Sequence, residues 1–198
     1  MKKVAVIGAS GNMGRRYTMI LEQYCLCRVI RIDIDSILGI EFLTCDGFII
    51  ATPTETHFEI IKELACHDKP ILCEKPITKS IDELKAILEL PDLDLSMINQ
   101  YEFLDSENEG HTIYNYFKTG SDSLYWDCIN IIGTARTTFE VKNCSLIWNC
   151  GLNGVLLSIS EMDQAYIDNI FGWVTGWRNK DYILPTHLKV LEHINEKG

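Results

Sequence analysis

A run of apolar residues that breaks into three evenly spaced glycines constrains this chain more than any other feature. Val4 to Ile7 are continuously apolar, as in a parallel strand covered on both faces, and Gly8, Gly11 and Gly14 follow them. Gly8 suits a tight turn, Gly11 lets a pyrophosphate approach the backbone, and Gly14 lets the next helix pack on the strand. The free N–H groups and the positive dipole at the start of that helix favour the binding of phosphate groups. The segment therefore predicts a strand, a turn and a helix that bind a dinucleotide.

A second predicted strand ends in an acidic residue. It runs from Arg28 to Asp33, and Asp33 follows Gly8 by 25 residues, where a ribose-binding carboxylate belongs. The alternatives are a solvated acid at a strand end, or Asp35 in the same role. A carboxylate here favours NAD, because it repels the 2′-phosphate of NADP. NADP remains an alternative cofactor, because three arginines lie nearby in the sequence: Arg15, Arg16 and Arg31.

Strands and helices alternate along the first half of the chain. Apolar runs predict strands at residues 4–7, 28–33, 47–51, 70–73 and 95–99. Helical periodicity predicts helices at residues 12–24, 52–67 and 80–90, the last two opened by capping boxes at Thr52 and Ser80. This alternation predicts an α/β fold, with a Rossmann-type doubly wound parallel sheet over residues 1–103. Because only eleven residues separate Asp35 from Gly47, one flank of the sheet must be reduced.

Residues 104–198 follow a different pattern, which predicts a small α+β domain. We expect a short helix at 111–118, antiparallel strands at 124–132, 135–143, 144–150 and 155–160, and terminal helices that begin at Asp163 and near Thr186. The terminal helices can cover only one face of such a four-stranded sheet, and an uncovered apolar face marks an interface. We therefore expect a homodimer that forms through this sheet.

Composition narrows the classes of partner. The net charge of −10, from 28 acidic and 18 basic residues, argues against a nucleic-acid surface and favours a small polar molecule. We find no apolar run of membrane-spanning length and no signal peptide before the first strand, so we expect a cytoplasmic protein. The eight cysteines contain no C-x-x-C pair and lie mostly in apolar segments, which indicates reduced thiols and no metal site.

Two motifs stand at predicted strand ends, in register behind the glycine turn: Ala51-Thr52-Pro53-Thr54-Glu55-Thr56-His57 and Cys73-Glu74-Lys75-Pro76. Together they resemble the Gfo/Idh/MocA family, the glucose-fructose oxidoreductase and inositol dehydrogenase group of NAD(P)-dependent enzymes. The resemblance covers residues 1–103 and returns in the final helices. It implies a nicotinamide cofactor at the carboxyl ends of the strands, with Lys75 beside the reacting carbon.

The sequence departs from the family's pattern in three ways. Its glycines are spaced G-x-x-G-x-x-G where the family more often has G-x-G-x-x-G, and its second domain is shorter. The stretch nearest to the family's D-x-G-x-H pattern is Asn149-Cys150-Gly151-Leu152-Asn153, and the alternative is that this stretch is only a hairpin turn and the catalytic helix is deleted. Asparagine does not exchange protons near neutral pH. A second function therefore stays open, a catalytically reduced dinucleotide-binding protein that serves as a sensor or partner subunit.

The function we expect first is hydride transfer between a nicotinamide cofactor and a small sugar-like, polyol or carbonyl substrate. Lys75 is the expected acid/base, although a lysine before proline is also typical of a solvated turn. Tyr101 is expected to line the nicotinamide or relay a proton, the alternative being a buried aromatic, and His57 contacts either cofactor or backbone. The expected catalytic residues are Lys75 and Tyr101, and the expected cofactor-binding residues are Gly8, Ser10, Gly11, Asn12, Met13, Asp33, Thr52, Pro53, Thr54, His57, Glu74 and Lys75.

Overall fold

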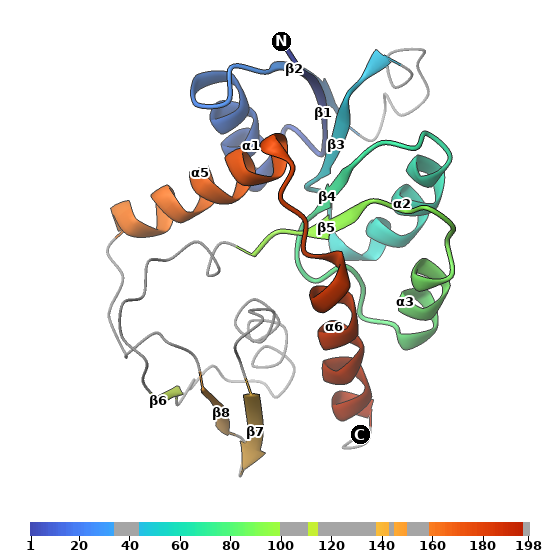
Figure 1. Ribbon diagram of the computed structural model, residues 1–198, viewed down its shortest axis with the longest axis vertical. Helices are drawn as coiled ribbons and strands as arrows, with labels where there is room; N and C mark the ends of the chain where they lie inside the picture. Colours follow the sequence, from blue (N-terminus) through green and yellow to red (C-terminus); the bar gives the residue numbers. More distant parts are fainter. Residues whose placement is uncertain (34–43, 100–110, 115–137, 143–144, 150–158, 196–198) are drawn as a thin grey trace. The chain divides into compact units, whose positions relative to one another are not determined.

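The chain forms two compact units. The computed structural model describes residues 1–33, 44–99, 111–114, 138–142, 145–149 and 159–195. The first unit contains Met1–Ile98 and Ile170–Lys180, and the second contains Asn99–Asn169 and Asp181–Gly198 (Figure 1). The predicted domain boundary at residue 103 remains a proposal.

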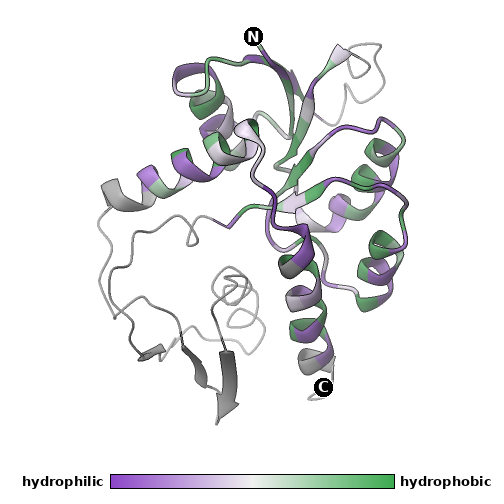
Figure 2. Ribbon diagram, in the orientation of Figure 1, coloured by the Kyte–Doolittle hydropathy of each residue, from purple (hydrophilic) through white to green (hydrophobic). Residues whose placement is uncertain are grey.

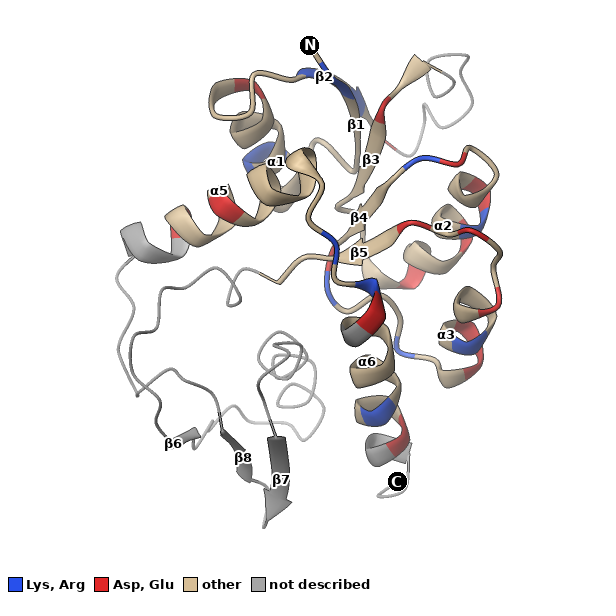
Figure 3. Cartoon of the chain, in the orientation of Figure 1, with Lys and Arg blue, Asp and Glu red and all other residues tan. Residues whose placement is uncertain are grey.

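A parallel sheet of five strands organises the first unit. The strands are β1 (Lys3–Ile7), β2 (Arg28–Ile32), β3 (Gly47–Ile50), β4 (Ile71–Cys73) and β5 (Leu95–Met97), in the spatial order β2-β1-β3-β4-β5. Every residue of β3, β4 and β5 is buried, which explains why β3 and β4 contain no alternating polar residues, whereas β5 contains the buried polar Ser96 (Figure 2). These three strands carry no charged residue (Figure 3). The predicted Rossmann-type parallel sheet is confirmed.

The order of the strands places the helices on both faces of the sheet. The chain moves from β1 to β2 in one direction and from β3 to β5 in the other, and right-handed crossovers then put α1 (Asn12–Gln23) on one face. They put α2 (His57–Ala65) and α3 (Ile81–Leu88) on the opposite face (Figure 1). Among the described residues β2 is the outermost strand on its side, in agreement with the predicted reduced flank. The strand order reverses between β1 and β3, where ligands bind in open α/β sheets.

The two predicted capping boxes have different outcomes. The hydroxyl of Ser80 caps α3, since it accepts a hydrogen bond of 3.3 Å from the backbone N–H of Glu83. The box predicted at Thr52 is wrong. A 3₁₀ turn, η3 (Thr54–Thr56), comes first with no side-chain cap, and α2 begins only at His57. The reason is that the Thr52 hydroxyl accepts instead from the hydroxyl of Thr56, at 2.8 Å.

A late segment of the chain completes the first unit. The indole ring of Trp173 lies against Gly47, where a Cβ atom would come within 2.8 Å of the ring. The side-chain amide of Asn179 exchanges two hydrogen bonds with the backbone of Met97, at 3.0 and 2.8 Å, as a neighbouring strand would. The guanidinium of Arg178 forms an ion pair of 2.6 Å with Asp94. Residues 170–180 therefore cover β5 with side chains rather than with another strand.

The described strands of the second unit match two of the expected strands and contradict the expected helix. Strands at Thr138–Lys142 and Ser145–Asn149 lie within those predicted at 135–143 and 144–150. Three short strands, β6 (His111–Tyr114), β7 (Thr138–Lys142) and β8 (Ser145–Asn149), pair antiparallel in the order β6-β8-β7. The predicted helix at 111–118 is wrong over its first four residues, because their backbone pairs with β8. The strand expected at 124–132 lies outside the described residues, and the four-stranded sheet remains a prediction.

Both terminal helices begin earlier than expected. The first, α5, spans Ile159–Thr175, so Asp163 lies inside it and the strand predicted at 155–160 is wrong at its last two residues. The second, α6, spans Lys180–Asn195 rather than starting near Thr186. It contains Pro185, which removes one backbone donor without ending the helix. Both helices therefore begin before the positions that the local pattern predicts, and the first includes two residues assigned to a strand.

Candidate functional site

Two glycines of the loop after β1 have no room for a side chain. Gly8 has a φ angle of +83°, and a Cβ atom there would lie 2.8 Å from the carbonyl oxygen of Ala51 at the end of β3. At Gly14, in the first turn of α1, a Cβ atom would lie 2.0 Å from the carbonyl oxygen of Gly8. Both contacts are with backbone, which moves less easily than a side chain. These glycines therefore let β1, β3 and α1 meet at the point where the strand order reverses.

Gly11 is subject to a different constraint. Its φ angle of −69° is ordinary for any residue, and a Cβ atom would lie 3.3 Å from its nearest neighbour, the carbonyl oxygen of Gly8. Gly11 is exposed and is the N-cap of α1, where no side chain caps the helix. The backbone at the helix start, before Asn12 and Met13, is thus left open. An open helix N-terminus beside a bare glycine suits a pyrophosphate, so this loop fits a dinucleotide.

Asp33 extends the same surface from the end of β2. Its carboxylate accepts a hydrogen bond of 3.0 Å from the backbone N–H of Ser10 and another from the Ser10 hydroxyl. These two bonds hold the pKa of Asp33 below its ordinary value, so the group is ionised at neutral pH. A carboxylate offers about four acceptor positions, which leaves capacity for ribose hydroxyls.

The three arginines that kept NADP open are exposed or half-buried. Arg15 donates to the backbone carbonyl of Ser10 and, at 2.7 Å, to the side chain of Asn12. Arg31 forms an exposed ion pair of 2.7 Å with Glu22. Positive charge therefore lies close to the glycine loop, on the same side of α1 as Ser10.

The carboxylate of Glu74 is buried at the end of β4 and is held from two directions. Glu74 is 8% exposed, and one of its oxygens accepts a hydrogen bond from the hydroxyl of Tyr17 on α1. The other oxygen accepts from the backbone N–H of Lys75, at 2.8 Å. Glu74 therefore orients the backbone of Lys75, and its carboxylate links α1 to the turn that follows β4.

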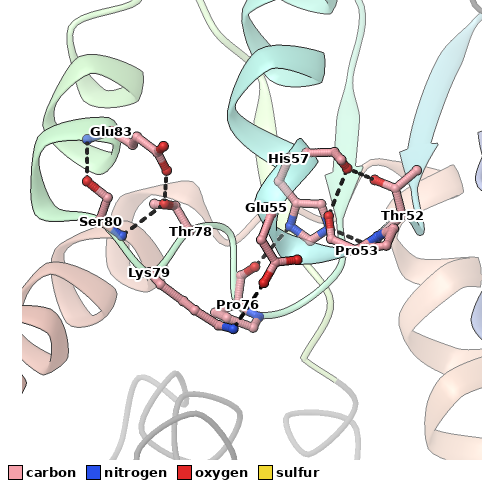
Figure 4. Close-up of polar contacts among 10 residues, drawn as sticks. Thr52, Pro53, Glu55, His57, Pro76, Thr78, Lys79, Ser80 and Glu83 are labelled. Carbon is pink, nitrogen blue, oxygen red and sulfur yellow. Dashed lines mark hydrogen bonds and ion pairs between the residues drawn. The ribbon is translucent and has the colours of Figure 1, made fainter. Parts of the chain in front are cut away.

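His57 lies between two loops at the carboxyl ends of the strands. Its ring is 1% exposed, with Nδ1 3.0 Å from the carbonyl oxygen of Pro76 and Nε2 2.8 Å from that of Thr52 (Figure 4). The peptide bond between Lys75 and Pro76 is cis. Of the two interpretations of His57 from sequence, contact with cofactor or with backbone, the geometry shows the backbone contact.

An exposed ion pair joins the same two loops. Lys79, in the turn after β4, lies 3.2 Å from Glu55 in η3 (Figure 4). The backbone N–H of Glu55 and the ammonium of Lys79 lower the pKa of the Glu55 carboxyl. The turn also contains Thr78, which donates to the Glu83 side chain and accepts from the N–H of Ser80 at 3.0 Å.

The sheet register places most of the expected site residues at one edge. Ile7 pairs with Ile32 and Ile50, and Ile50 pairs with Cys73, so the next residue of each strand lies in one row. Those residues are Gly8, Asp33, Ala51 and Glu74, and Thr52, Pro53, Thr54, His57 and Lys75 follow within the same loops. Tyr101 and Asp35 lie outside the described residues.

Sequence reasoning missed two contributors to this edge. Tyr17 had no expected role at the site, whereas its hydroxyl binds Glu74 across 57 positions of sequence. Lys79 had no expected role, and its partner Glu55 is 24 positions away. Neither pairing has a local pattern that predicts it.

Comparison with known proteins supports this arrangement. Residues 27–92 match the family model of the GFO_IDH_MocA oxidoreductases, described as an oxidoreductase family with an NAD-binding Rossmann fold. The predicted resemblance to the Gfo/Idh/MocA family is confirmed. The matched range contains both Gfo/Idh/MocA motifs, at residues 51–57 and 73–76, whereas the glycine loop precedes it. A search of curated proteins found no significant match.

Solved structures of several dehydrogenases and oxidoreductases share the fold. A Gfo/Idh/MocA family oxidoreductase from Vibrio cholerae is 11% identical, with a TM-score of 0.67 over 100% of this chain and 99% of that one. A myo-inositol dehydrogenase from Corynebacterium glutamicum is 13% identical, with a TM-score of 0.66 over 98% and 95%. A dehydrogenase from Clostridium difficile is 14% identical, with a TM-score of 0.65 over 100% and 99%. At such identities the likeness concerns the fold alone.

No metal site accompanies the candidate dinucleotide site in the part of the chain that the structure describes. No group of three or more histidine, cysteine, aspartate or glutamate side chains there is arranged to hold a metal ion. Within the same residues, none of the helices has the length and apolar character needed to cross a membrane.

Proposed function

We propose that this chain is an NAD-dependent oxidoreductase that acts on a small sugar-like, polyol or carbonyl substrate. The observation that carries the proposal is the loop between β1 and α1. Gly8 and Gly14 are sterically required there, whereas Gly11 is only weakly constrained, because a Cβ atom there would lie 3.3 Å from the carbonyl oxygen of Gly8. Asp33 presents an ionised carboxylate beside that loop. A helix start for the pyrophosphate and a carboxylate for the ribose are what a dinucleotide requires.

Lys75 is the residue to which we assign proton transfer. The bound nicotinamide would supply the hydride acceptor or donor, and the protein must move the proton of the reacting hydroxyl. Lys75 is half-buried, and its backbone is held by the buried carboxylate of Glu74. An amine on a fixed backbone at the ligand-binding edge of the sheet can hold that proton and return it. Tyr101 remains a proposed second catalytic residue.

Calorimetry tests the cofactor. Titrations of the chain with NAD⁺, NADH, NADP⁺ and NADPH should show binding of NAD(H), and weaker binding of NADP(H) because of the charge on Asp33. Failure to bind any of the four at millimolar concentration refutes the proposal. A preference for NADP(H) refutes the role of Asp33. It would indicate that the 2′-phosphate is bound by one of the nearby arginines, Arg15, Arg16 or Arg31.

A second candidate function is a dinucleotide-binding protein without turnover, a sensor or partner subunit. It is favoured by the sequence, which lacks the family's D-x-G-x-H pattern and has Asn149-Cys150-Gly151-Leu152-Asn153 as its nearest stretch. Cofactor binding does not distinguish the two functions, but NADH formation across a panel of polyols and sugars does. Steady NADH formation with any member of the panel rejects the second candidate.

The proposed assembly is a homodimer formed through the C-terminal sheet, in the cytoplasm. Light scattering at micromolar concentration should give twice the mass of one 22.6 kDa chain. A monomer mass would contradict the dimer. Cross-links confined to residues of the parallel sheet and its helices would contradict the proposed interface.

A further inference from the structure

The ring of His57 is buried, and both of its nitrogens face main-chain carbonyl oxygens. It is 1% exposed, and each of its two nitrogens lies within hydrogen-bond distance of a main-chain carbonyl oxygen, that of Thr52 or that of Pro76. Carbonyl oxygens only accept, so each contact forms a hydrogen bond only where that nitrogen carries a proton. No ring nitrogen is left to contact a cofactor, although His57 stands in a motif that suggests one.

The two carbonyls belong to different loops of the ligand-binding edge. Thr52 follows β3, and Pro76 is in the turn that follows β4 (Figure 4). His57 itself is the first residue of α2, so its backbone is fixed by a helix. The ring therefore joins the turn after β4 to a rigid part of the unit. The exposed pair of Lys79 and Glu55 joins the same loops from outside, where solvent weakens it.

Lys75 lies between two buried anchors of this turn. On its N-terminal side the carboxylate of Glu74 accepts from the N–H of Lys75 and from the hydroxyl of Tyr17. On its C-terminal side the carbonyl oxygen of Pro76 lies 3.0 Å from Nδ1 of His57. The residue that we assign to proton transfer is thus held on both sides, from α1 and from α2.

We propose that His57 is a positioning residue, which fixes the backbone of the Lys75–Pro76 turn through Nδ1 and does not bind the cofactor. The inference rests on the proposed function for the role of Lys75 in the reaction. The contact itself can be tested without any substrate. The contacts of Nδ1 and Nε2 can also be tested one at a time, because the amide group of asparagine can replace the first and that of glutamine the second.

Two conservative variants separate the two contacts. The amide nitrogen of asparagine is two bonds from Cβ, as is Nδ1, so His57→Asn keeps a donor for the carbonyl of Pro76. The amide nitrogen of glutamine is three bonds from Cβ, as is Nε2, so His57→Gln keeps a donor for Thr52 only. Both variants bury one amide in place of one ring. A ring that only fills space would be replaced better by the larger glutamine, which is the opposite order to the one that the Nδ1 contact predicts.

Hydrogen exchange, measured by mass spectrometry on the cofactor-free chain, reports how well the backbone of the turn is held in place. Amides of residues 74–80 should exchange about tenfold faster in His57→Gln and His57→Ala than in wild type, and within about threefold of wild type in His57→Asn. Peptides from α1 serve as the internal reference. Equal exchange in the asparagine and glutamine variants overturns the proposal, and this comparison decides the matter even where His57→Ala does not fold.

Calorimetry with NAD⁺ separates this inference from the proposed function. The dissociation constant of His57→Asn should stay within about threefold of wild type, since the ring makes no contact with the cofactor. A loss of more than about tenfold in that variant, with exchange unchanged, shows a cofactor contact and overturns the proposal. Absence of NAD⁺ binding by wild type refutes the proposed function and leaves the exchange result to be judged separately.

Discussion

Replacing Gly14 by alanine should disrupt the junction of β1 and α1. The added methyl group would lie 2.0 Å from the carbonyl oxygen of Gly8 and 2.7 Å from Cα of Ala9. Ordinary contacts of a Cβ atom begin at 3.4 Å, so α1 must move away from the strand. Overpacking costs about 1–3 kcal/mol, and contacts with backbone belong at the upper end.

Helix propensity opposes this cost only in part. Alanine is favoured over glycine inside a helix by about 1 kcal/mol, which leaves a net loss of about 2 kcal/mol in the free energy of unfolding. For a chain of 198 residues that loss lowers Tm by roughly 4–8 °C. Displacement of the helix start should also weaken NAD⁺ binding, by about tenfold or more.

Gly11→Ala is the matched control. Its methyl group meets nothing closer than 3.3 Å and its φ angle is already ordinary, so the slightly tight contact and the lower entropy of the unfolded chain nearly cancel and Tm should change by less than in Gly14→Ala. The methyl group nevertheless covers the exposed N-cap, and NAD⁺ affinity should fall about tenfold. Differential scanning calorimetry and isothermal titration of both variants give the four values needed.

The two glycines are thus expected to separate stability from binding. An unchanged Tm in Gly14→Ala would show that α1 and β1 are not in contact as described. Undiminished NAD⁺ affinity in Gly11→Ala would refute the assignment of the bare helix start to the pyrophosphate.

Three further predictions follow from single side chains. Lys75→Met should reduce turnover by about 10²–10⁴ while leaving the NAD⁺ dissociation constant within about threefold, and near-native turnover would remove this lysine from the mechanism. Ser10 holds the folded pKa of Asp33 below its ordinary 3.8, so this contact stabilises the fold above that pH and the stabilisation is lost as pH falls through the lower folded value. Urea titrations should therefore show the stability gap between wild type and Asp33→Asn shrinking in acid, and a pH-independent gap would contradict the contact. Burial, together with neighbouring Cys27, raises the pKa of the Cys25 thiol to about 11, so its alkylation by iodoacetamide at pH 8 should be at least about a hundredfold slower than that of an unperturbed cysteine. Rapid alkylation at pH 8 would show that the thiol is open to solvent.

Local sequence pattern was sufficient for the parallel sheet and its glycine loop. Val4 to Ile7 are apolar at every position because helices cover both faces of the strand, and that burial is visible in the sequence itself. Gly8 and Gly14 are predictable for a related reason, since a tight turn and a close helix contact exclude every other residue. The ends of parallel strands share one edge, so the pattern also placed Asp33 and Glu74 together.

The boundaries of helices were less predictable. The Thr52 hydroxyl resembles an N-cap in sequence, but it accepts from Thr56 and α2 begins at His57. Pro185 suggests the start of a helix, but α6 begins at Lys180. In each case the competing interactions differ little in free energy, and the surrounding structure decides which one forms.

Contacts between distant segments depended on the tertiary structure alone. Asn179 pairs with the backbone of Met97 across 82 positions, and Tyr17 binds Glu74 across 57. A polar side chain is compatible with many partners, and burial selects one by making an unpaired group costly. The same holds for His57, whose motif suggested a cofactor and whose ring meets two carbonyls. Sequence by itself determined which edge of the sheet carries the candidate dinucleotide site, because periodicity and glycine sterics are local, whereas the partners of its buried polar groups were decided only by folding.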